Sequence, residues 1–119
     1  MNDKNITRQK TMDFAVKIVK LCNRLKDGKK EFNMSNQLFR SGTSIGANYC
    51  EAQNGASKKD FLNKVIIALK EARETEYWLE LLYKTEYLDG QEYQSIIKDC
   101  DEILSILAAI TKKVKADIT

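Results

Sequence analysis

The stretch FRSGTSIGANYCEAQNG, residues 39–55, carries polar side chains at a spacing that could support acid–base chemistry. Four of them share one stripe of a helix, at i, i+4, i+8 and i+11: Arg40, Ser44, Asn48 and Glu51. Glu71 and Glu74 are candidate partners for Arg40, and Arg73 is a candidate partner for Glu51. Two carboxylates beside a guanidinium can act in acid–base catalysis. The same residue types also form networks that fix helix register, and we favour this structural interpretation.

Other chemistry finds little support in the residues. The chain has no histidine, which removes the usual di-iron ligand set and the commonest general base. Its three cysteines, Cys22, Cys50 and Cys100, form no C-x-x-C pair, which argues against a disulfide framework or a zinc site. Gly42 and Gly46 are followed by no G-K-[S/T], as a phosphate loop would require. We therefore predict a non-enzymatic protein with no catalytic residue, cofactor or metal.

Composition indicates a single globular domain over residues 1–119. Hydrophobic residues make up 43% of the chain and charged residues 31%, and proline is absent. No apolar run approaches the roughly 20 residues needed to cross a bilayer, and no apolar stretch of a signal peptide follows the N-terminal charges. These features predict a reduced cytoplasmic protein without a membrane partner.

Apolar residues recur at i, i+3, i+4 and i+7 in four segments, which predicts helices at about 8–27, 34–54, 58–86 and 91–116. Gly28 stands where a glycine commonly ends a helix. Ser57 with Asp60, and Asp89 with Glu92, resemble helix starts. Short links between four helices predict an all-α fold, an antiparallel up-down-up-down four-helix bundle.

Residues 39–55 then form the second helix, although glycine is costly there. Gly42 and Gly46 together cost about 2 kcal/mol relative to alanine. Close approach of a neighbouring helix would offset this cost, because glycine has no side chain to obstruct it.

Two motifs in this order carry a family resemblance. Residues 40–51 match the pattern R-S-x-T-S-I-x-x-N-x-x-E, and residues 67–75 match I-A-x-x-E-x-x-E-T, followed by Tyr77 and Trp78. The chain resembles the four-helix-bundle proteins encoded in intervening sequences of bacterial 23S ribosomal RNA genes. More distantly, it is similar to accessory proteins of diversity-generating retroelements, which bind nucleic acid and reverse transcriptase. The resemblance implies a homo-oligomer, typically a pentamer, and an association with RNA that is supposed from gene context.

Charge is distributed unevenly along the chain. Residues 1–30 hold nine Lys and Arg against three acids, and residues 71–102 hold three against ten. The basic first segment supplies candidate nucleic-acid contacts: Arg8, Lys10, Lys17, Lys20, Arg24, Lys26, Lys29 and Lys30. The alternatives are a solvated charged face, or a basic helix that holds helices or subunits in register beside the acidic region.

Tyr77 and Trp78 are candidates for a subunit interface, where Tyr and Trp are enriched, although a lone tryptophan also fits the core. Two functions therefore remain open. One is a homo-oligomer that binds RNA, other nucleic acid or a nucleoprotein through a basic first helix. The other is an oligomeric scaffold that binds a protein partner and has no nucleic-acid role.

Overall fold

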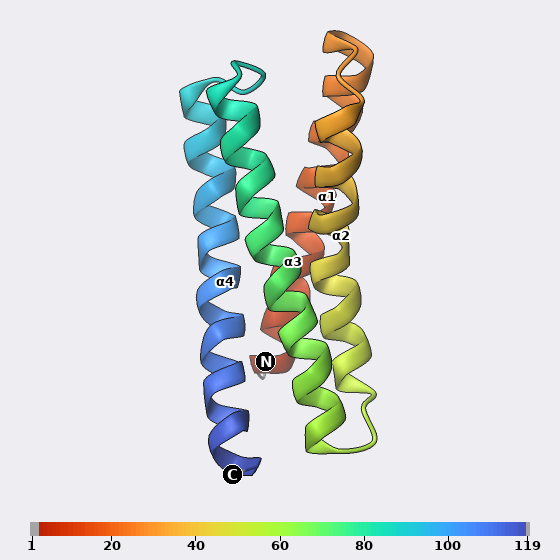
Figure 1. Ribbon diagram of the computed structural model, residues 1–119, viewed down its shortest axis with the longest axis vertical. Helices are drawn as coiled ribbons and strands as arrows, with labels where there is room; N and C mark the ends of the chain where they lie inside the picture. Colours follow the sequence, from red (N-terminus) through yellow and green to blue (C-terminus); the bar gives the residue numbers. More distant parts are fainter. Residues whose placement is uncertain (1–2, 119) are drawn as a thin grey trace.

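The computed structural model describes residues 3–118, and the apolar periodicity resolves into four helices. They are α1 (Asp3–Lys29), α2 (Asn33–Gln53), α3 (Lys58–Lys84) and α4 (Gly90–Ile118). Consecutive helices run antiparallel (Figure 1), so the predicted all-α four-helix bundle is confirmed. Within this part of the chain, no helix is both long and apolar enough to span a membrane.

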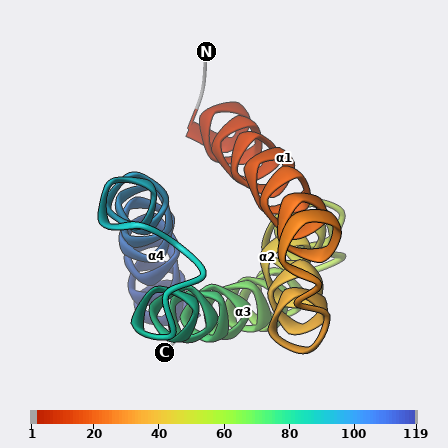
Figure 2. The same cartoon turned by 90° about the horizontal axis from the view of Figure 1, so that it is seen from above.

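Seen along the bundle, the helices follow one another around an open ring in the order α1, α2, α3, α4 (Figure 2). The α2–α3 pair is packed most closely and the α1–α4 pair most loosely. The core lies between them and includes fully buried Leu38, Ile45, Leu79 and Leu107. Because α1 and α4 meet so sparsely, one side of the bundle is closed mainly by the side chains along this seam.

Two predicted helix starts are confirmed by their capping bonds. The Ser57 hydroxyl accepts a hydrogen bond from the backbone N–H of Asp60 at 3.1 Å. The Asp89 carboxylate accepts one from the N–H of Glu92 at 2.8 Å. Each bond satisfies an N–H group that has no partner within its own helix.

Gly28 does not end the first helix, contrary to its predicted role. It lies inside α1, which also begins earlier than the sequence pattern suggested. The left-handed backbone conformation falls instead on Lys30, with φ of 56°. A non-glycine residue can occupy this conformation at modest cost, so a glycine in the last turn does not by itself fix where a helix stops.

The glycines of α2 allow α1 to approach closely, as predicted. A Cβ atom built on Gly42 would lie 2.8 Å from Cγ2 of Ile18, and one on Gly46 would lie 3.1 Å from Oγ1 of Thr11. Ile18 is fully buried at this crossing. The close packing of Ile18 and Thr11 therefore offsets the low helix propensity of the two glycines.

Candidate nucleic-acid interface and polar network

The predicted ion pairs of Arg40 are present between α2 and α3. Its Nη1 lies 3.2 Å from Oε2 of Glu71, and its Nη2 is in contact with Oε2 of Glu74. The indole Nε1–H of Trp78 donates a hydrogen bond to the same Glu74 oxygen at 3.2 Å. One guanidinium thus pairs with two carboxylates, an arrangement that fixes the register of α2 against α3.

The predicted pairing of Glu51 with Arg73 is wrong. Glu51 is paired instead with Lys64, whose Nζ lies 3.2 Å from Oε2 of Glu51. The antiparallel register explains the difference: Arg40 lies opposite Glu71 and Glu74, so Glu51, farther along α2, lies opposite an earlier residue of α3. At a rise of 1.5 Å per residue, Arg73 is about 13 Å too far along the helix.

Ser44 and Asn48 do not join this network across the helices. The Ser44 hydroxyl donates to the carbonyl of Arg40 at 2.5 Å, and the Asn48 amide donates to the carbonyl of Ser44 at 2.8 Å. Both side chains satisfy their hydrogen bonds on their own helix. They keep the surface of α2 narrow and polar without supplying an acid or a base.

The polar contact at the centre of the α2–α3 interface is a pair of buried hydroxyl groups. Thr75 and Ser41 are both fully buried, and their hydroxyl oxygens lie 2.9 Å apart. The Thr75 hydroxyl also lies 2.8 Å from the carbonyl of Glu71. The polar network predicted from the sequence included neither residue, although Ser41 lies between Leu38 and Ile45 on the side of α2 that faces the core.

Three of the eight candidate nucleic-acid contacts are engaged within the molecule. Ion pairs cross the seam from α1 to α4 at Lys10–Glu102, Lys17–Asp99 and Arg24–Glu92. The three basic residues are seven apart, so they follow one side of α1. All six side chains are at least one-third exposed, so each pair contributes about 1 kcal/mol or less to stability. Their arrangement holds α1 in register with α4.

The other five candidates remain on the surface of α1 and the loop after it. The Lys26 ammonium lies 5.8 Å from the centre of the Phe39 ring, a cation–π contact. The remaining four side chains are exposed: Arg8, Lys20, Lys29 and Lys30.

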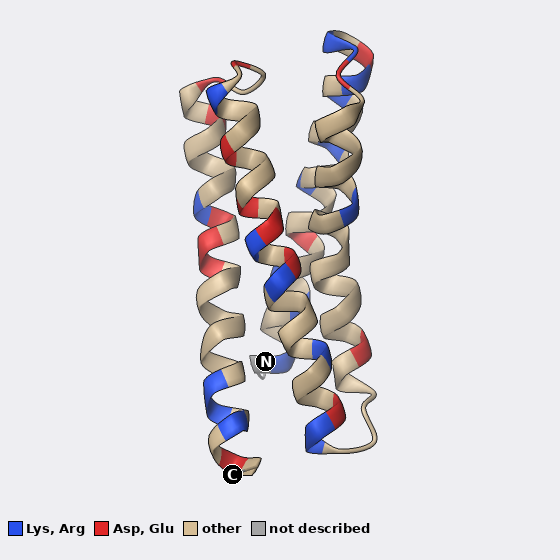
Figure 3. Ribbon diagram, in the orientation of Figure 1, with Lys and Arg blue, Asp and Glu red and all other residues tan. Residues whose placement is uncertain are grey.

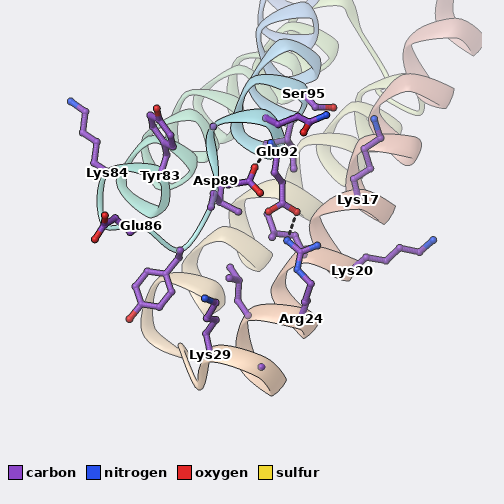
Figure 4. A pocket seen from close by; sticks show the side chains of 18 residues that line it. Lys17, Lys20, Arg24, Lys29, Tyr83, Lys84, Glu86, Asp89, Glu92 and Ser95 are labelled. Atoms are coloured by element: carbon purple, nitrogen blue, oxygen red, sulfur yellow. Dashed lines mark hydrogen bonds and ion pairs between the residues drawn. The ribbon is translucent and has the colours of Figure 1, made fainter.

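A hollow of about 1350 Å³ separates the second half of α1 from the α3–α4 loop and the start of α4. Lys20, Arg24 and Lys29 lie on one side of it, and Asp89 and Glu92 lie on the other (Figure 4). The dashed line between Arg24 and Glu92 in the figure marks their ion pair. Because its walls carry both charges, this hollow is poorly suited to a polyanion.

Tyr77 and Trp78 have different environments despite being neighbours. Tyr77 is 59% exposed on the outside of α3, whereas Trp78 is half-buried and packs against the core. Their rings meet edge to face, with centroids 5.1 Å apart. Trp78 is thus chiefly a core-edge residue that supports the exposed Tyr77 ring.

The buried cysteines are poor nucleophiles. Burial raises the pKa of the Cys22 thiol to about 11 and that of Cys100 to about 12. Both therefore stay protonated at neutral pH, and the thiolate is the reactive form. In the chain from residue 3 to 118, no group of three or more His, Cys, Asp or Glu side chains is placed to hold a metal ion.

An acidic contact between α3 and α4 makes stability depend on pH. The Glu76 carboxyl has a raised pKa, first through its hydrogen bond with Asp101, then through burial and the Asp101 charge. Arg73 opposes this shift, and Glu80 adds to it. A carboxyl group whose pKa is raised by folding stabilises the folded state most at pH values below the ordinary pKa of Glu. This stabilisation is lost as the pH rises through the pKa of the group in the folded state.

We therefore expect Glu76→Gln to raise the free energy of unfolding by roughly 0.5 kcal/mol at pH 7. Below about pH 4 the advantage over the wild type should disappear, because Glu76 is then protonated in both folded and unfolded chains. Urea unfolding at several pH values measures this difference. Glu86→Gln, in the exposed α3–α4 loop, is the control. An equal gain for both variants, or one that persists at low pH, would rule out the Glu76–Asp101 contact as its cause.

Comparison with known proteins agrees with this architecture. Residues 3–109 match the family model described as 23S rRNA-intervening sequence protein. A crystal structure of a protein of unknown function from the S23 ribosomal protein family of Bacteroides thetaiotaomicron VPI-5482 is 54% identical. The alignment covers 89% of this chain and 98% of that one, with a TM-score of 0.88. No curated protein matches. The chain belongs to the 23S rRNA-intervening sequence protein family.

Proposed function

We propose that this protein is a non-enzymatic, cytoplasmic homo-oligomer that binds RNA or another nucleic acid. The pentamer that the family resemblance implies is the assembly we propose. The observation that carries the proposal is that two kinds of side chain are exposed on the surface of the subunit. Exposed apolar side chains lie on more than one helix, and exposed basic side chains lie outside the ion pairs.

The apolar side chains support self-association. On α1, Met12 and Val16 are 47% and 45% exposed and lie one turn apart. On α3, Ile67 and Tyr77 are 40% and 59% exposed. Exposed apolar side chains on two different helices of one subunit suit a ring, in which the α1 side chains of each copy meet the α3 side chains of the next. Tyr77, with Trp78 behind it, is the aromatic anchor that such an interface favours.

The basic side chains support nucleic-acid binding. Exposed Lys and Arg side chains that have no ion pair with any other residue in the described range lie at both ends of the bundle, such as Arg8 and Lys58 at one end and Lys20 and Lys29 at the other. An oligomer would repeat this charge in every subunit and so strengthen the attraction to phosphates. RNA is the preferred ligand because of the family to which the chain belongs.

The second candidate is an oligomeric scaffold for a protein partner, with no nucleic-acid role. The three α1–α4 ion pairs favour it, because they give part of the basic helix a purely structural use. Under this alternative the remaining charges serve solubility and assembly.

Size-exclusion chromatography with light scattering and absorbance at two wavelengths separates the candidates, using protein purified without nuclease. We expect a mass near five times the 13.7 kDa subunit, with excess nucleic-acid absorbance that is lost at high salt. An oligomer with protein-like absorbance would favour the protein-partner scaffold. A monomer would contradict the proposed assembly.

Tyr77→Glu should shift the assembly toward monomers, because it places a charge in the proposed apolar contact. We expect the apparent dissociation constant of the oligomer to rise by about 100-fold while helical content is unchanged. Light scattering over a dilution series measures this shift. Ala109→Glu, at an exposed position of α4, is the matched control and should assemble as the wild type does. If the two variants assemble equally well, Tyr77 is outside the interface.

A further inference from the structure

The positive charge of the bundle collects at one end. The antiparallel arrangement brings the beginnings of α1 and α3 to the same end as the ends of α2 and α4 (Figure 1). We call this the basic end and define it as residues 3–8, 51–64 and 112–118. Its sequence holds eight basic residues against four acids, Asp3, Glu51, Asp60 and Asp117. The basic residues are Lys4, Arg8, Lys58, Lys59, Lys64, Lys112, Lys113 and Lys115.

The opposite end carries no net charge. Residues 20–31 and 80–92 together hold six basic and six acidic residues, and the middle of the bundle holds six basic against seven acidic. The basic tip of the α1–α2 hairpin is thus balanced by the acidic tip of the α3–α4 hairpin. The whole excess of positive charge in the chain, which totals +3, comes from the basic end.

The basic end is also where the cations are least neutralised by neighbours. Lys64 is paired with Glu51 there. Six other side chains are exposed and form no ion pair with another described residue: Lys4, Arg8, Lys58, Lys59, Lys112 and Lys113. Figure 3 shows Lys and Arg along the last turns of α4 and at the start of α3, at the same end of the molecule. Charges that are free of internal partners attract an external polyanion most strongly.

A small hollow of about 360 Å³ lies between the elements that form this end. Lys4 of α1, Lys58 of α3 and Val114 of α4 line it, together with Gln53 at the end of α2. Two lysines of the basic end, Lys4 and Lys58, therefore line the same opening.

We propose that the basic end of the bundle, rather than the side of α1, is where the phosphate backbone of nucleic acid docks. The inference rests on the proposed nucleic-acid function and assigns that function to residues from three helices. Lys58 and Lys59 from α3 and Lys112 and Lys113 from α4 carry most of the binding, with Lys4 and Arg8 beside them. Contacts of this kind read the backbone, so affinity depends on salt and only weakly on sequence.

Two variants with equal charge change test this assignment. The end variant carries Lys58→Glu, Lys59→Glu, Lys112→Glu and Lys113→Glu. The side variant carries Lys20→Glu, Lys26→Glu, Lys29→Glu and Lys30→Glu. Both lose the same net charge, so a difference between them reports location rather than overall repulsion. Fluorescence anisotropy with a labelled RNA duplex of about 20 base pairs at low salt gives the affinities.

We expect the end variant to bind the duplex about 100-fold more weakly than the wild type, and the side variant within about 10-fold. An end variant that binds as tightly as the side variant, or more tightly, overturns the assignment while leaving nucleic-acid binding intact. A wild-type protein that does not bind the duplex removes the proposed function itself, and the inference with it. Circular dichroism checks folding, and glutamine versions of both variants repeat the comparison if the glutamate versions do not fold.

Discussion

Replacement of Gly42 by valine is expected to lower the free energy of unfolding by about 3 kcal/mol. A Cβ atom at this position would lie 2.8 and 2.9 Å from two side-chain carbons of Ile18 and 3.3 Å from its Cβ. Ile18 is branched and fully buried, so it cannot move aside without shifting α1 away from α2. The gain in helix propensity over glycine is below about 1 kcal/mol and does not offset this overpacking.

Urea unfolding followed by circular dichroism, at one fixed protein concentration, measures the effect. Gly28→Ala is the control, because a Cβ atom there has no neighbour within 4 Å and alanine should slightly stabilise the helix. Combining Gly42→Val with Ile18→Ala should cost less than the sum of the two changes, since the smaller residue leaves space for the valine. A Gly42→Val protein as stable as the wild type would show that α1 and α2 do not approach as closely as described.

Leu79→Ala should destabilise the bundle by about 2–5 kcal/mol. Leu79 is fully buried in α3 and belongs to the central apolar cluster, so its truncation removes buried methyl groups and leaves a cavity. Against a total stability of about 5–15 kcal/mol, this loss would move the unfolding midpoint well below that of the wild type.

Ile6→Ala removes the same number of carbon atoms from a side chain that is 38% exposed, and it should cost less than about 1.5 kcal/mol. The two variants are compared by urea unfolding at the same concentration, because assembly would otherwise change the apparent stability. Equal losses at the two positions would contradict the placement of Leu79 in the core.

The sequence predicted the helices and the close approach at Gly42 because both leave local signals. Apolar spacing marks each helix, and a glycine inside an amphipathic pattern requires a compensating contact. The Arg40 pairs were also predictable, since their partners lie on the polar side of the next helix. The Glu51–Arg73 pair was predicted wrongly, because one sequence gives no measure of how far two helices slide along each other.

The charge pattern shows the same limit more clearly. Windows along the chain identified residues 1–30 as basic and residues 71–102 as acidic. Folding places these segments side by side, where Lys10, Lys17 and Arg24 meet acids of α4. The basic end was missed because it combines short segments near residues 4, 58 and 112, none of which stands out alone. The antiparallel fold brings these segments together and places their charges at one end of the bundle.

The most direct test of nucleic-acid binding is the salt dependence of wild-type affinity for the labelled RNA duplex. If at least four lysines contact phosphates, the logarithm of the association constant should fall against the logarithm of salt concentration with a slope of about −3.6 or steeper. The same slope with duplex DNA would indicate contacts to the backbone. No binding at low salt, or an affinity that does not change with salt, would contradict the account and favour the protein-partner scaffold.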